Sequence, residues 1–129
     1  MKYFTIKELT RSSVATQRGW DNTPPPAAEQ NLRSLVENVL DPLREAFGRP
    51  IYVNSGYRTT RLNKAVGGTP NSQHLRGQAA DIRAATPLET RRLGRLLQAS
   101  TLPFDQLIFY PNFIHVSWNN TPRHQVLYR

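Results

Sequence analysis

A stripe of apolar residues at helical spacing is the clearest pattern in the chain. Its members follow one another by three, one, three, one, three and four positions: Leu32, Leu35, Val36, Val39, Leu40, Leu43 and Phe47. This spacing predicts one face of a long amphipathic helix. Because Asp41 and Pro42 fall inside it, we expect the helix to kink or restart there with Asp41 as the new cap. Gly48 and Pro50 should end it.

The first residues of two other segments also predict helices. Thr5 is a possible cap for a short helix near the start of the chain. Thr86 and Glu89 form a capping box, which predicts a second helix running to about residue 99. The polar stretch 55–70 has no core periodicity beyond one helical turn around 61–66. Loops of this length in compact domains are usually functional or disordered.

Short apolar runs predict the strands of a sheet. They lie at 51–54, 78–83, 105–110 and 113–118, with a possible edge strand at 125–128. The third and fourth runs are separated only by a Pro-Asn pair, which predicts an antiparallel hairpin. We therefore expect an α+β fold, in which helices pack on one face of an antiparallel sheet.

Composition narrows the class of protein. The chain has 129 residues, 38% of them hydrophobic, and no cysteine. This length suits a single domain with one modest core, which we expect to be monomeric. Without cysteine, disulfides and thiol nucleophiles are excluded, and any metal must be held by His, Asp or Glu. No window approaches the roughly 18 apolar residues of a membrane span and the start lacks a secretory signal pattern, so we expect synthesis in the cytoplasm without a signal peptide.

The basic charge raises the question of partners. A formal net charge of +8 suits nucleic acid, an anionic cell envelope or simple solubility, and it cannot choose among them. The densest basic group, at Arg91, Arg92 and Arg95, is expected on a solvated helix face. No phosphate loop and no RNA-binding signature is present, so we expect no specific nucleic-acid partner.

The alternation of residues along the predicted strands indicates candidate metal ligands. Within their strands, Asp81 and His115 point away from the positions expected to face the core. His74 precedes Asp81 by seven residues with Gly77 between them, so a turn could fold the imidazole back beside the carboxylate. Two imidazoles and one carboxylate leave a Zn²⁺ ion one free position, as catalytic sites require. The alternative is a His74–Asp81 hydrogen bond that braces a turn, with His115 an ordinary polar residue.

The motif Ser72-x-His74-x-x-Gly77-x-Ala79-x-Asp81, followed by a strand that carries His115 in His-Val-Ser, resembles a known family. It is similar to the zinc D-Ala-D-Ala carboxypeptidase and endolysin superfamily, peptidase family M15, and to its branch of small M15A-like domains. Further similar blocks lie at 41–44, 53–58, 62–68 and 104–108, and all the blocks occur in the same order along the chain as in this family. The resemblance implies one M15A-like peptidase domain over residues 1–129, with the hedgehog and DD-peptidase fold and a metal on the open face of its sheet.

The resemblance also implies roles for individual residues. His74, Asp81 and His115 would be the ligands of one zinc ion. Arg58 would stabilise the scissile carbonyl or bind a substrate carboxylate, since a guanidinium stays charged and forms paired hydrogen bonds to anionic oxygens. Ser72 would orient substrate or brace the His74 loop. The implied activity is zinc-assisted hydrolysis of the peptide stem of peptidoglycan.

The general base is where this chain departs from the family. Many relatives place a carboxylate shortly before the last zinc ligand, whereas this chain has Asn112 and Tyr110 at those positions. Asp105 is the acidic residue nearest to the His115 hairpin in sequence, and it could serve instead as a turn or cap residue. Tyr110 could donate to an oxyanion, but a phenol with a pKa of about 10 is a poor base. His124, an imidazole in the loop after the His115 strand, is a further candidate base, and the alternative is an exposed loop residue.

Three functional hypotheses follow. The first is a zinc peptidase that cuts cell-wall peptides next to a D-amino acid, reaching the wall after lysis or by a non-standard export route. The second, suggested by the missing carboxylate, is a zinc-containing, catalytically impaired module that binds peptidoglycan peptides without cutting them. The third is an anion or nucleic-acid binder that uses the charge alone.

Overall fold

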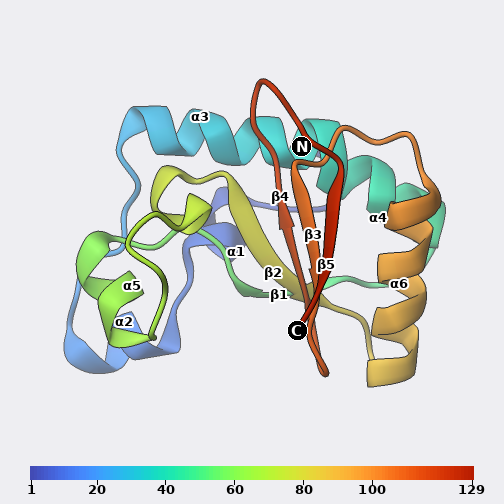
Figure 1. The fold of residues 1–129 in the computed structure, drawn as a ribbon. Helices are drawn as coiled ribbons and strands as arrows, with labels where there is room; N and C mark the ends of the chain where they lie inside the picture. Colours follow the sequence, from blue (N-terminus) through green and yellow to red (C-terminus); the bar gives the residue numbers. More distant parts are fainter.

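A computed structural model describes all residues, 1–129, as an α+β fold with one five-stranded sheet (Figure 1). The helices are α1 (Ile6–Thr10), α2 (Ser13–Arg18), α3 (Pro26–Leu35), the π-helical turn η1 (Val36–Leu40), α4 (Asp41–Phe47), α5 (Thr60–Ala65), the 3₁₀ turn η2 (Gln73–Arg76) and α6 (Pro87–Ala99). The strands are β1 (Tyr52–Ser55), β2 (Ala79–Arg83), β3 (Gln106–Phe109), β4 (Ile114–Ser117) and β5 (Gln125–Tyr128). None of the helices combines the length and the apolar character that crossing a membrane requires.

The sheet is mixed, with strand order β1-β2-β4-β3-β5. Neighbours are antiparallel except that β5 pairs parallel to β3, so the expectation of a purely antiparallel sheet was wrong at this edge. The reason is topological. Both edges of β4 are already taken by β2 and β3, so the returning chain must pair with the free edge of β3 and runs in the same direction as that strand.

The long amphipathic helix forms as predicted, but without a restart at Asp41. Pro42 has no N–H and its ring crowds the preceding turn, and the helix accommodates it with the π turn η1, in which the Asp41 N–H reaches the Val36 carbonyl. The Asp41 backbone is itself helical, so its expected role as a cap was wrong. Its carboxylate instead accepts the backbone N–H groups of Lys2 at 2.6 Å and Tyr3 at 3.0 Å, which fixes the N-terminal segment.

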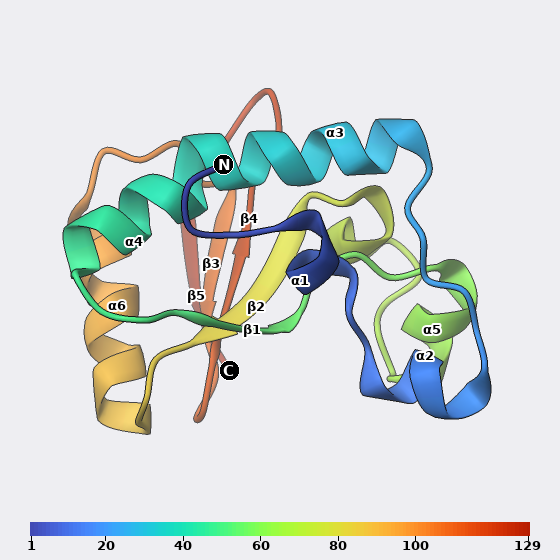
Figure 2. The ribbon, with the colours of Figure 1, turned by 180° about the vertical axis from the view of Figure 1, so that it is seen from behind.

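The hydrophobic core lies on one face of the sheet. Figure 2 shows α3 and α4 running across this side of the molecule, and α6 stands beside them. Ala80 and Ile82 of β2 and Ile114 and Val116 of β4 join the helices in one cluster of 19 buried residues. The alternate residues of the same strands therefore face the opposite side, as strand periodicity predicted. The caps predicted at Thr5 and Thr86 are confirmed by hydrogen bonds to backbone N–H groups three residues on.

Candidate metal centre

The register of two neighbouring strands places Asp81 and His115 side by side. Asp81 of β2 lies directly opposite His115 of β4 in the antiparallel ladder. Residues opposite each other in such a ladder project from the same face with adjacent side chains. The His115 Nδ1 atom lies 3.0 Å from Asp81 Oδ1, on the face away from the core. Both strands thus contribute one polar group to the same spot.

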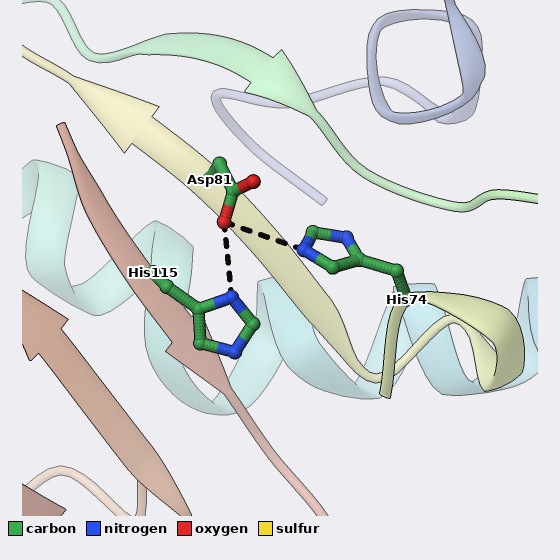
Figure 3. A group of neighbouring side chains, drawn as sticks. All are labelled: His74, Asp81 and His115. Carbon is green, nitrogen blue, oxygen red and sulfur yellow. Dashed lines mark hydrogen bonds and ion pairs between the residues drawn. The ribbon is translucent and has the colours of Figure 1, made fainter. Parts of the chain in front are cut away.

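His74 reaches this spot from the short turn η2 (Figure 3). Its Nε2 atom lies 3.3 Å from the same Asp81 oxygen. Gly77 makes the approach possible, because it has a φ of 71° where the chain turns into β2 and because a Cβ there would collide with the Ala28 carbonyl. The glycine of the motif is therefore required by both the turn and its packing.

A carbonyl oxygen fixes the orientation of the His74 ring. Nδ1 of His74 lies 2.6 Å from the Gly56 oxygen, and since a carbonyl only accepts, Nδ1 carries the proton and donates it. Nε2, on the side of the ring that faces Asp81, is therefore the nitrogen that can bind a metal or share a proton with this carboxylate. The ring is only 3% exposed. Gly56 is itself confined, because a Cβ there would collide with the Leu9 carbonyl. Hydrogen bonding of the remote nitrogen is the usual outer-shell support of a metal-binding histidine.

The donor set fits a zinc ion. The ligand atoms of His74, Asp81 and His115 all lie within 4.8 Å of one another. Burial alone would raise the pKa of Asp81, but hydrogen bonds and charge from His115 and then His74 outweigh it and hold this pKa far below its ordinary value. The carboxylate is therefore ionised, as ligation requires. Two imidazole nitrogens with one carboxylate oxygen favour Zn²⁺ over harder ions and leave a coordination position open.

Arg58 lies beside the three candidate ligands, as the sequence suggested. Its Nη2 atom is 3.2 Å from the second Asp81 oxygen, Oδ2, and its side chain is 13% exposed. Nε donates to Ser55 Oγ at 3.0 Å and Nη1 donates to Asn63 Oδ1 at 3.2 Å. Burial lowers the pKa of Arg58, while Asp81 and Tyr110 act to raise it. The guanidinium nevertheless stays charged, because its ordinary pKa is so high.

Two residues that support this centre were not predicted from the sequence. Asn63 is buried in α5 and holds Arg58, and Ser55 holds it from β1. In the sequence, the only local signal for Asn63 was its position next to Leu62 in an otherwise mostly polar segment. Ser72 was predicted, and its Oγ accepts the His74 backbone N–H at 3.2 Å, which corresponds to bracing the His74 loop.

Asp105 lies in the same cavity, of about 550 Å³, as the candidate ligands, but its carboxylate is already engaged. It is 0% exposed, and Arg123 donates to it from Nε at 2.9 Å, from Nη2 at 2.8 Å and from the backbone N–H at 3.1 Å. Gln73 donates at 3.1 Å. The hydrogen bonds from Arg123 hold the pKa of Asp105 below its ordinary value. This environment favours a structural ion pair over the general base suggested by the sequence.

The other two candidates for proton transfer lie in different places. Tyr110 lines the cavity, and its ring stacks on Phe113 with centroids 4.5 Å apart. His124 does not line it, because its ring packs on Phe104 at 3.9 Å and its Nε2 lies 3.3 Å from the Ser100 oxygen. The only carboxylates that line the cavity are Asp81 and Asp105. Asp81 contacts two imidazoles and Arg58, and Asp105 is paired with Arg123.

The fold and this three-ligand site define a metallopeptidase-like class, and comparison with known proteins gives the family. A sequence profile of the family described as Peptidase M15 matches residues 2–117, so the chain belongs to peptidase family M15. A zinc D-Ala-D-Ala carboxypeptidase of Streptomyces albus G is 38% identical over 85 residues, which are 64% of this chain and 32% of that protein. The chain thus spans about a third of the length of this curated relative. The resemblance to peptidase family M15 is confirmed.

Proposed function

We propose that the protein is a zinc-dependent peptidase that hydrolyses a peptide of the bacterial cell wall next to a D-amino acid. The observation that carries the proposal is the convergence of His74, Asp81 and His115 beside Arg58 in one cavity. Membership of peptidase family M15 supports a peptide substrate. The similarity to a protein described as a zinc D-Ala-D-Ala carboxypeptidase supports zinc and the D-amino acid.

In this proposal His74, Asp81 and His115 hold the ion. Bound zinc supplies a Lewis acid that polarises the scissile carbonyl and lowers the pKa of water at the site. Arg58 stabilises the anionic oxygen that develops during attack, or binds a substrate carboxylate. Three of the five N–H groups of its guanidinium are engaged with Asp81, Ser55 and Asn63, which leaves two to donate. Tyr110 would donate a further hydrogen bond to substrate, which its position in the lining of the cavity supports.

A second candidate function is favoured by one observation, the lack of a free carboxylate in the cavity. Asp81 belongs to the ligand set, and Asp105 is held by Arg123 and Gln73. A proton acceptor would have to be Asp105 after release from Arg123, or a group from substrate or solvent. If none serves, the protein is a zinc-containing module that binds wall peptides without cutting them.

One experiment separates the two candidates. Purified protein is freed of metal by a chelator, reconstituted with zinc, and incubated with peptidoglycan and with a stem peptide ending in D-Ala-D-Ala. Mass spectrometry then follows released D-Ala and new amino termini. Zinc-dependent release supports the peptidase. Stoichiometric zinc and measurable peptide binding, with no release at any pH, support the binding module instead.

A further inference from the structure

A second cavity, of about 360 Å³, adjoins the metal site, and we name it the arginine–aromatic cavity. It is lined by Arg91 and Arg95 of α6, by Phe109 of β3, by Tyr128 of β5, and by Arg129. Tyr110 and Arg129 line both this cavity and the metal-site cavity. The two cavities therefore meet at the ends of β3 and β5, close to the C-terminus marked in Figure 1.

The arginines of this cavity have no anionic partner. Arg91, Arg95 and Arg129 make no ion pair, and no Asp or Glu lines the cavity. Other arginines of the chain do have acidic partners: Arg92 pairs with Glu89 at 3.0 Å, and Arg123 pairs with Asp105. Arg91 and Arg95 are four residues apart on one helix, a spacing at which like charges repel. An anion bound between them would relieve this repulsion.

Two aromatic rings give the cavity a fixed apolar wall. Phe109 and Tyr128 stack with centroids 5.0 Å apart and planes only 8° apart. Phe109 is locked against α6 at Gly94, where a Cβ would collide with its ring. Tyr128 is 68% exposed, so its hydroxyl and much of its ring are open to a ligand. Such a wall suits the aliphatic part of a peptide whose acidic group reaches the arginines.

We propose that the arginine–aromatic cavity is a substrate subsite, which binds a carboxylate-bearing segment of the wall peptide beyond the bond held at the metal centre. This inference rests on the proposed function, because that function supplies a peptide at the adjoining cavity. Arg129 and Tyr110 border both cavities, so one extended peptide can occupy them together. Nucleic acid also binds arginine and aromatic groups, but a cavity of about 360 Å³ fits a few amino acids better than a strand of nucleotides.

The test uses two synthetic stem peptides that differ only in their side-chain carboxylates, free in one and amidated in the other. Binding to the full chain is measured by calorimetry, with zinc bound and after metal removal. We expect the free acid to bind about 5-fold more tightly, since exposed ion pairs each contribute about 1.4- to 5-fold in affinity. Arg91→Gln and Arg95→Gln should shrink this preference to less than about 2-fold, and Tyr128→Ala should weaken both peptides.

A matched control lies at the opposite edge of the sheet, where Arg83 sits 4.8 Å from the centroid of the exposed Tyr52 ring. Arg83→Gln and Tyr52→Ala should leave both affinities unchanged. Equal affinity for the two peptides, absence of binding by either, or equal losses in the control variants would overturn the subsite. So would an oligonucleotide that competes with the free acid and depends on the same arginines.

Failure of the subsite and failure of the proposed function give different results. Zinc-dependent release with the same KM for free and amidated peptides would exclude the subsite and support the proposed peptidase. Tighter binding of the free acid than of the amidated peptide, without any zinc-dependent release, would support the subsite and exclude the proposed hydrolysis.

Discussion

Two buried carboxylates, Asp81 and Asp105, line one cavity and have opposite surroundings. On one side of its carboxylate Asp81 faces two imidazole nitrogens, which can carry a proton or bind a metal. Asp105 faces a guanidinium, a backbone N–H and an amide NH₂, all of which only donate. A metal can replace protons between Asp81 and its histidines, whereas no such group of His, Asp or Glu side chains surrounds Asp105.

The difference teaches that burial and a lowered pKa do not by themselves identify a functional acid. The pKa is lowered for both carboxylates. Perturbed pKa values occur in structural ion pairs as well as in active sites. What separates the two is the chemistry of their partners, and that separation can be tested by substitutions on each side.

The largest effect is expected on zinc affinity, when either imidazole beside Asp81 is removed. Loss of an outer-shell partner alone costs about 10- to 100-fold in metal affinity, so His74→Ala and His115→Ala should weaken zinc binding by more than about 100-fold. Competition with a chromogenic chelator measures the affinity, and elemental analysis measures the stoichiometry. His124→Ala is the matched control, since His124 lies outside the cavity, and it should retain the metal. Release of zinc by His124→Ala would show that the ligand set is wrong.

Arg58 should show the next largest effect. Removing one preorganised donor from a developing oxyanion costs about 100-fold in rate, so Arg58→Gln should reduce turnover by about that factor. Zinc should stay bound, because His74 and His115 are untouched. Steady-state kinetics on a D-Ala-D-Ala peptide measure the loss, and Arg58→Lys tests whether charge alone restores part of it. Full activity of Arg58→Gln would exclude the role proposed for this side chain.

The outcome for Asp81 and Asp105 also shows what sequence could predict. Strand alternation placed Asp81 and His115 on the open face because a period of two needs no knowledge of the partner strands. The spacing of His74 before Asp81 suggested the third ligand, and the resemblance to family M15 added Arg58. All four side chains lie together.

The features that could not be predicted from the sequence depend on contacts between distant residues, which leave no repeating pattern along the chain. Arg123 reaches Asp105 from 18 residues away, through a loop that has no apolar pattern. The parallel pairing of β5 has the same origin, since it follows from which strand edges are already occupied and not from residues 125–128 themselves. The π turn before Pro42 was anticipated only as a kink or a restart of the helix.

Substitutions of Asp105 and Arg123 should lower the free energy of unfolding and leave zinc affinity unchanged. Asp105→Asn removes charge-assisted hydrogen bonds from a buried group, and we expect a loss of about 1–3 kcal/mol in the free energy of unfolding. Arg123→Gln should cost about 1 kcal/mol or less, because its side chain is 55% exposed and solvent screens the charge. Urea denaturation measures both. If Asp105→Asn instead abolished turnover at unchanged stability while Tyr110→Phe did not, Asp105 would be the general base.

The smallest expected effect is a pH dependence that Asp105→Asn should remove. The pKa of Asp105 is lowered on folding, chiefly by hydrogen bonds from Arg123, whereas in the unfolded chain it is about 3.9. Below that value the unfolded state binds a proton that the folded state does not, so this contribution is complete above about pH 4 and is lost as pH falls towards the folded pKa. The native chain should therefore lose stability more steeply than Asp105→Asn as pH falls below about 4. Parallel curves for the two proteins would show that the Asp105–Arg123 pair adds no net stability on folding.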